Sequence, residues 1–227
     1  MTRPAGGRRG ADAAPYPVGM DRIYVETAIA ADVETVWRLT QDPVSHARWD
    51  IRFSRIDPDP RPESDATTPT RFRYERRTPL HTVRGTGVSV GERQRADGTR
   101  TSALRFHTRD RLSPIRSGHG FWRYVPDGDR TVFLTGYDYT PGWGPLDLIV
   151  RPLLGWATAW SFDRLRIWIE TGVPPERWPL VSVVWWWRRD RPRAARCART
   201  PTRARRGSGV ATAPATLEAL PDPKDGA

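Results

Sequence analysis

The stretch WGPLDLIVRPLLGWATAWSFDRLRIWIETG, from Trp143 to Gly172, decides the fold. Pro145 suits the first turn of a helix, where a missing N–H costs nothing, and Gly172 provides a stop. We therefore predict one long amphipathic helix over residues 143–171, kinked near Pro152. Its apolar residues recur at the spacing of a single helix face: Leu146, Ile149, Val150, Leu153, Ala157, Trp160, Ile167 and Trp168.

Strand-like segments precede this helix and are separated by turn signals. The dipeptides Asp97-Gly98 and Asp127-Gly128 are typical of tight hairpins. Regular spacing of strands with tight turns favours a consecutive antiparallel sheet. Two short helices are expected after the first strand, one capped by Asp32 and one over residues 44–47, with a break at Asp42-Pro43. The expected strands cover residues 22–29, 53–56, 70–77, 81–94, 101–109, 115–125 and 131–140.

The positive charge of the chain lies mainly outside the expected domain. The net charge is +11, and residues 176–227 hold eleven Lys and Arg against five Asp and Glu. Segments rich in Gly, Pro, Ala and Arg with little to bury are expected to be disordered. We therefore predict a disordered N-terminal tail over 1–19, one folded domain over 20–174, a Trp-rich short helix or extension over 175–187, and a disordered Arg-rich tail over 188–227.

The stretch IYVETAIAADVETVWRLTQDPVSHARWD, residues 23–50, resembles the opening of the START-like (SRPBCC) helix-grip superfamily. That superfamily includes polyketide cyclases/dehydrases and lipid-transport proteins, and the resemblance covers roughly residues 21–173. It implies an α+β fold in which a curved antiparallel sheet of about seven strands wraps around the long C-terminal helix. Members bind lipids, hormones or polyketides between the two, and some catalyse cyclisation or dehydration. The superfamily has no universal catalytic motif to carry over.

Several aromatic residues are candidates to line a cavity between the sheet and the helix, where apolar walls with a few polar groups hold small ligands. For any single one of them, ordinary core packing is the favoured interpretation. Arg164 falls on the apolar stripe of the helix. It either binds a ligand carboxylate or enolate, or forms an internal salt bridge, or extends its stem to the rim. The candidate ligand-binding residues are Arg164, Trp160, Trp37, Trp49, Tyr74, Trp122, Tyr124 and Tyr137.

No catalytic residue is assigned from the sequence. His107 and His119 lie on neighbouring strands, and the neighbours of His107 suggest that it faces outward. Asp50 is an acidic alternative, with a turn or cap after Trp49 as the plainer interpretation. The four histidines fall at no metal-ligand spacing, Cys197 is the single cysteine, and no phosphate-binding loop is present, so neither metal nor cofactor is expected.

The leading hypothesis is a domain that binds a hydrophobic small molecule of the lipid or polyketide class. One alternative is a polyketide cyclase/dehydrase, and another is an interaction protein whose basic tail contacts membrane or nucleic acid. Trp185, Trp186 and Trp187 with the following arginines suit a peripheral membrane contact, unless the rings pack back on the domain. A nucleic-acid partner is disfavoured. No apolar run follows the early arginines, so a cytoplasmic location is expected.

Overall fold

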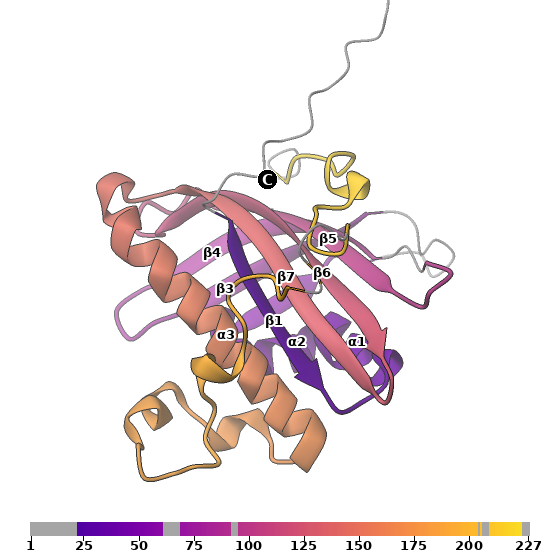
Figure 1. Cartoon of the computed structure of the whole chain (residues 1–227). Coiled ribbons are helices and arrows are strands. Elements are labelled where there is room, and N and C mark those ends of the chain that lie inside the picture. The colour runs from indigo at the N-terminus through magenta and orange to yellow at the C-terminus, as the bar shows by residue number, and fades with distance from the viewer. Residues whose placement is uncertain (1–21, 61–68, 92–94, 204, 206–208, 224–227) are drawn as a thin grey trace, which may run out of the picture.

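The computed structural model describes residues 22–60, 69–91, 95–203, 205 and 209–223 (Figure 1). Its strands and α-helices follow the order that the sequence predicts. In chain order they are β1 (Ile23–Ile29), α1 (Val33–Gln41), α2 (Pro43–Trp49), β2 (Arg55–Pro58), β3 (Thr70–Arg77), β4 (Thr82–Gly91), β5 (Arg100–His107), β6 (Ile115–Asp127), β7 (Arg130–Pro141) and α3 (Asp147–Thr171).

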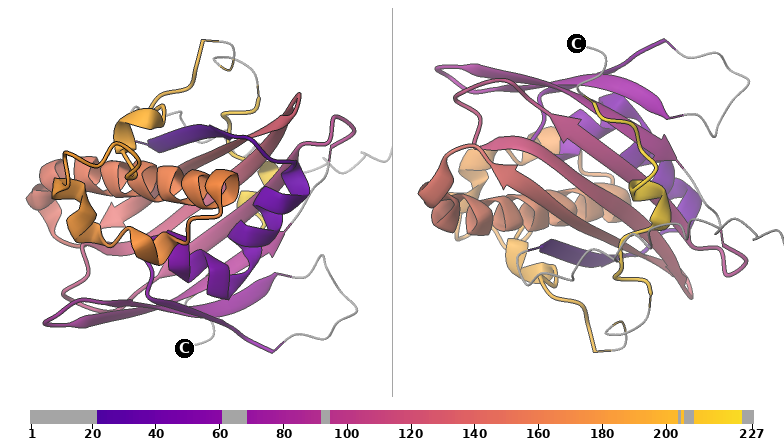
Figure 2. Two further views of the ribbon diagram at one scale, coloured as in Figure 1. Left: turned by 90° about the horizontal axis from the view of Figure 1, so that it is seen from below. Right: turned by 90° about the horizontal axis from the view of Figure 1, so that it is seen from above.

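The seven strands form one antiparallel sheet in the order β1-β7-β6-β5-β4-β3-β2. The sheet is bent, and α3 lies along its concave face while α1 and α2 cover one end (Figure 2). Only β1 departs from a simple meander, because it pairs with β7 at the edge. The predicted α+β helix-grip architecture is therefore confirmed.

The corner between α1 and α2 follows from a single Asp-Pro pair. Asp42 ends α1, and its side chain then accepts a hydrogen bond of 2.7 Å from the Ser45 N–H to begin α2. Pro43 occupies the first turn of α2, where no N–H donor is needed. Asp32 caps α1 in the same way through the Thr35 N–H at 2.7 Å. These caps place α2 against the end of the sheet.

The long helix differs from its prediction at the N-terminal end. A 3-10 turn, η1 (Gly144–Leu146), comes first, and α3 runs for 25 residues from Asp147. Gly172 ends it in the left-handed conformation, with φ of 72°. The predicted apolar stripe is wrong in the first half of the helix, since Leu146, Ile149 and Leu153 are exposed. In the second half of α3, by contrast, residues on more than one side of the helix are buried, because the protein covers the helix there from more than one direction.

The chain after α3 packs onto the domain in the part that the structure describes, where the sequence predicts a disordered tail over 188–227. The η2 (Pro175–Arg177), η3 (Leu180–Val184) and η4 (Ala194–Arg196) turns cover the side of α3 away from the sheet. Ala198 then pairs with Glu26 of β1 through backbone hydrogen bonds of 2.9 and 3.0 Å. Small buried side chains and backbone pairing order this segment, and neither shows as an apolar run in the sequence.

The last described residues cross the convex face of the sheet (Figure 2, right). Leu217 and Leu220 bury against Val88 and Ala103 of the outer face. The buried Arg123 side chain donates to the backbone carbonyls of residues 209 and 210. The predicted tail over residues 1–19 lies outside the described residues.

On the concave face, aromatic rings lie flat on the sheet over glycines of the neighbouring strands. The ring of Tyr74 lies over Gly85, that of Phe72 over Gly87, and that of Phe106 over Gly118. A Cβ added at Gly87 would stand 2.2 Å from the Phe72 ring. The β3–β4 register is unbroken at Gly85 and Gly87. The glycines provide the space that the rings occupy.

We predict that Gly118→Ala destabilises the fold by about 1–3 kcal/mol. The added Cβ would meet the Phe106 ring at 2.3 Å and the backbone oxygen of Asp138 at 2.8 Å, and the backbone cannot move aside cheaply. Gly209→Ala is the matched control, since open space surrounds that position. Urea unfolding of both variants measures the difference. Equal stability of the two variants would contradict the account of the glycines.

Candidate functional site

The concave face is filled at the end covered by α1 and α2. Trp49 lies among Trp122, Phe133 and Phe162 with ring centroids 6.1 to 6.3 Å apart, and Phe133 stacks on Phe162 at 4.4 Å. Tyr124 stacks on Phe133 at 5.0 Å. These side chains are almost fully buried. Three of the candidate residues, Trp49, Trp122 and Tyr124, thus form a packed core at this end.

Away from that end, the concave face carries aromatic side chains that are only half-buried. They are Phe53, Phe72, Tyr74 and Phe106. Phe53 meets Tyr74 edge-on at 5.7 Å, and Phe72 lies 6.5 Å from Tyr74. Burial raises the pKa of the Tyr74 hydroxyl, which therefore stays protonated at neutral pH. The result is an aromatic surface, with one hydroxyl, that retains access to solvent.

A buried polar cluster stands between these two regions. The Arg52 side chain binds Asp50 through Nε at 2.9 Å and Nη2 at 2.6 Å. His46 Nε2 lies 3.3 Å from the second Asp50 oxygen. All three residues come from α2 or the turn after it, so the helix end and the turn set their geometry. The cluster holds a carboxylate, a guanidinium and an imidazole inside an aromatic enclosure.

Neighbouring elements extend the cluster to the sheet and to α3. The Arg52 guanidinium lies 5.4 Å from the ring centroid of Tyr137 on β7. The Tyr137 hydroxyl in turn lies 2.9 Å from the Thr158 hydroxyl on α3. The His46 ring stacks on Trp49 at 5.0 Å and meets Trp122 edge-on at 4.8 Å. The cluster is therefore the point where α2, β7 and α3 meet.

Burial and pairing set the charge states of the cluster. Burial lowers the pKa of His46 against the opposing influence of Asp50, so the imidazole is neutral at neutral pH. Burial opposes ionisation of Asp50, yet the Arg52 charge and the His46 hydrogen bond outweigh it and lower the pKa of that carboxyl. Asp50 is thus ionised beside a neutral imidazole and a charged guanidinium. Such a set can bind an anionic or carbonyl oxygen and can accept a proton.

We predict that stability falls as pH falls below about 6.5, the ordinary histidine pKa. The unfolded chain binds a proton at His46 that the folded chain, with its lowered pKa, does not, so acid favours unfolding. His119 has a lowered pKa of the same sign, so the test compares His119→Gln with the double variant that adds His46→Gln. Thermal unfolding from about pH 7.5 to 5.5 should show a smaller drop in the double variant. Identical drops would exclude His46 as the source.

Arg164 and Trp160 do not face the sheet. Arg164 Nε and Nη2 donate to the Pro175 carbonyl at 2.8 and 2.5 Å, and Nη1 lies 3.5 Å from the Trp49 carbonyl. Burial lowers the pKa of Arg164 to about 10, which keeps it charged at neutral pH. Its partners are backbone carbonyls, an arrangement that the sequence alternatives did not include. Trp160 lies beside it, 5.5 Å from the guanidinium.

The remaining candidates lie at the edges of this arrangement. Trp37 on α1 is half-buried and meets Tyr124 edge-on at 5.0 Å, with Arg100 5.4 Å from its ring. His107 and His119 belong to the convex side of β5 and β6, as the register with β4 and β7 shows. His119 lines a pocket of about 530 Å³ there, under residues 212–223. Within the described residues, no three His, Cys, Asp or Glu side chains gather as a metal site.

The sequence pointed to the concave face but not to its polar cluster. The sequence does not single out His46 or Arg52, and it favours a cap or turn for Asp50. Asp50 does make that turn, since its Oδ1 accepts the Arg52 N–H at 3.0 Å. The available signal was the spacing of His46 four residues before Asp50 on one helix face and of Arg52 just after it. Only the tertiary packing shows that this face turns inward.

The chain is similar in sequence to a curated bacterial protein and similar in structure to several solved proteins. No protein-family model matches the chain. A Bacillus subtilis (strain 168) protein named "Uncharacterized membrane protein YndG" is 39% identical over 170 residues. The match covers 72% of this chain and 62% of that protein, so the chain spans less than two thirds of the relative. Within the described residues, no helix combines the length and the apolar character needed to cross a bilayer.

Three solved structures illustrate the similarity in shape. A START superfamily protein from Mycobacterium smegmatis has a TM-score of 0.46 at 14% identity, over 63% of this chain and 92% of its own. A STAR-related lipid transfer protein from Xanthomonas axonopodis has a TM-score of 0.45 at 16% identity, over 64% of this chain and 83% of its own. The Zhui aromatase/cyclase from Streptomyces sp. R1128 has a TM-score of 0.41 at 16% identity, over 53% of this chain and 67% of its own. Nothing about a ligand of this chain follows from them.

The fold follows from the architecture itself. A strand, two short helices, a run of antiparallel strands and a long closing helix occur in that order, and β1 closes on β7. The chain has an α+β helix-grip fold. What it binds has to be argued from its own side chains.

Proposed function

We propose that this protein binds a hydrophobic small molecule of the lipid or polyketide class between the concave face of the sheet and α3. The observation that supports this most is the half-buried aromatic surface of Phe53, Phe72, Tyr74 and Phe106. Aromatic side chains contribute to folding most when they are fully buried, and each apolar Å² left in contact with water forgoes roughly 25 cal/mol. A bound apolar molecule supplies the missing cover.

The polar cluster gives the ligand an orientation. Arg52 is charged and its side chain is less than one fifth exposed, at the inner end of the aromatic surface. A ligand whose carbonyl or carboxylate points inward meets this guanidinium, the neutral His46 and the Tyr137 hydroxyl. Pockets for small molecules commonly combine apolar walls with a few such polar groups. The proposed ligand therefore has an apolar body and at least one oxygen at the end that enters first.

We expect Phe106→Ala to weaken ligand binding about tenfold, because the ring supplies part of the apolar surface. Calorimetric titration with fatty acids, sterols and aromatic polyketides identifies the bound class. Trp187→Ala is the control, since Trp187 is an exposed aromatic outside the concave face. Binding by wild type that Phe106→Ala leaves unchanged would place the ligand elsewhere, and no binding across the panel would refute the proposal.

A second candidate function is catalysis on the same ligand class. The observation that favours it is the contact between His46 and Asp50, since an imidazole that stays neutral at neutral pH can accept a proton from a bound substrate. Arg52 beside it would stabilise the oxyanion that results. Product analysis in the same panel separates the two functions. Turnover that is lost in His46→Gln while binding persists supports an enzyme, and saturable binding without product supports a binding protein.

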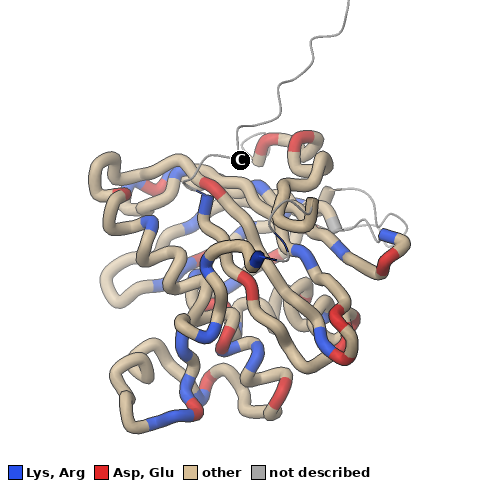
Figure 3. Tube along the Cα trace, viewed as in Figure 1, with Lys and Arg blue, Asp and Glu red and all other residues tan. Residues whose placement is uncertain are grey.

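We also propose a peripheral membrane contact through the segment after α3. Trp186 and Trp187 are 78% and 59% exposed, and Val181 and Val184 beside them are exposed as well. Arg188 and Arg189 follow directly, and Figure 3 shows basic residues along this loop at the lower left. Aromatic rings next to arginines suit the interface of an anionic bilayer. The B. subtilis relative is named a membrane protein, which agrees with such a contact. The cytoplasmic location stays a prediction.

We expect the double change Trp186→Ser and Trp187→Ser to reduce binding to phosphatidylglycerol vesicles about tenfold, because both rings lose their place in the interface. Vesicle sedimentation measures it. Leu80→Ser is the control, because Leu80 is an apolar residue on the β3–β4 turn that is even more exposed than the two tryptophans. Equal losses in the two variants would show that the contact is not made by the tryptophans.

A further inference from the structure

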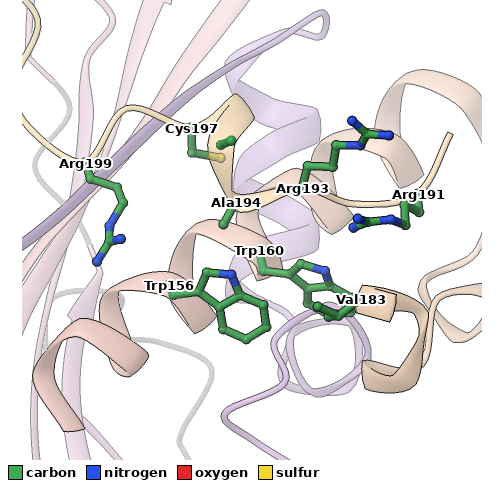
Figure 4. Close-up of a pocket in the computed structure, with 9 residues that line it drawn as sticks. Trp156, Trp160, Val183, Arg191, Arg193, Ala194, Cys197 and Arg199 are labelled. Atoms are coloured by element: carbon green, nitrogen blue, oxygen red, sulfur yellow. The ribbon is translucent and has the colours of Figure 1, made fainter. Parts of the chain in front are cut away.

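A pocket lies on the side of α3 that faces away from the sheet. It has a volume of about 430 Å³ and lies between α3 and the segment from Val183 to Arg199 (Figure 4). The indole rings of Trp156 and Trp160 stand side by side on α3, with centroids 6.4 Å apart and planes at 26°. Ala194 and Cys197 lie above them in this view. The concave face of the sheet is on the other side of the helix, so this site is separate from the one proposed above.

Two buried donors in the wall of this pocket lack an acceptor. Trp160 is 1% exposed, and its Nε1–H has no hydrogen-bond partner among the described residues. The Nε–H of Arg193 is likewise buried with no partner there. Leaving a buried donor unpaired costs about 1–3 kcal/mol, and most such groups in proteins are satisfied. Both missing partners are acceptors, which points to an oxygen-bearing ligand.

The charge around the pocket has one sign. Arg191, Arg193 and Arg199 line it, and none of the nine lining residues is acidic. The nearby Asp163 carboxylate is fully buried and already accepts from Arg166, Arg196 and the Arg193 backbone N–H, at 2.8, 3.0 and 2.7 Å. Burial raises the pKa of the Cys197 thiol to about 12, so it adds no negative charge. The lining arginines therefore attract an anion that enters the pocket, and no carboxylate in the lining repels it.

We infer that this outer pocket binds an anionic amphiphile, whose apolar body lies against Trp156 and Trp160 and whose carboxylate or phosphate accepts from Trp160 Nε1 and the arginines. The indoles and Val183 supply apolar walls, and arginine supplies paired donors suited to such oxyanions. The volume falls within the range of small-molecule pockets. A free amphiphile and a lipid headgroup share this chemistry, and the experiment separates them.

The first arm titrates the full chain with dodecanoate below its micelle concentration, with dodecanol as the uncharged match. We expect dodecanoate binding to weaken about tenfold in Arg193→Gln and about fivefold in Trp160→Phe, which keeps the ring stack and loses the donor. Ala195→Trp fills the pocket from an exposed position and should abolish this binding. Arg84→Gln, an exposed arginine on β4, is the control. Phe106→Ala should leave the outer site intact, so failure of the concave-face proposal is seen separately.

The second arm measures sedimentation with phosphatidylglycerol vesicles. Dodecanoate binding with the stated losses supports the inference with a free amphiphile as the source. Vesicle binding that Ala195→Trp abolishes, without dodecanoate binding, supports it with a lipid headgroup as the source. Dodecanoate affinity that is the same in wild type, Arg193→Gln and Ala195→Trp would overturn it. So would dodecanol binding that is as tight as dodecanoate binding and is abolished by Ala195→Trp, or failure of both dodecanoate and the vesicles to bind through the pocket.

Discussion

The buried carboxylate of Asp163 is the constraint on which the far side of α3 depends. It sits fully buried in the middle of the helix, and a buried charge left without partners costs several kcal/mol. Its partners are Arg166 one turn away and, from the C-terminal segment, the Arg193 N–H and the Arg196 side chain. This pairing holds that segment against α3. The outer pocket exists because the segment is held there.

The concave side obeys a different constraint, which is steric. Glycines under Tyr74, Phe72 and Phe106 let the rings lie flat, so the sheet stays free of side chains that would rise toward α3. At the end covered by α1 and α2, the rings of Trp49, Trp122 and Phe133 interlock and leave a filled core. The change from a packed core to half-buried rings along one sheet distinguishes the proposed binding surface from an ordinary interior.

Local signals in the sequence predicted the elements, and contacts distant in the sequence decided the sites. The strand over residues 70–77 has the predicted bounds because alternation and flanking turns are local properties. The sequence places Arg164 on a stripe of the helix but does not identify its hydrogen-bond partner, because a turn after the helix positions the Pro175 carbonyl. The contacts of residues 188–203 with the domain are not visible in the sequence for the same reason. These contacts are to Glu26 and Asp163, far away in the chain.

The two proposed sites are joined by a short chain of contacts through α3. Trp160 in the outer pocket lies beside Arg164, Arg164 reaches the Trp49 carbonyl, and Trp49 stacks on His46 of the inner cluster. Contact alone does not establish coupling, which requires an element with two arrangements that both sites bias. Arg164 qualifies as that element only if an anion at Trp160 competes with the Pro175 and Trp49 carbonyls for its guanidinium. Since coupling of affinities is reciprocal, an apolar ligand on the concave face must then change the affinity of the outer pocket by the same factor.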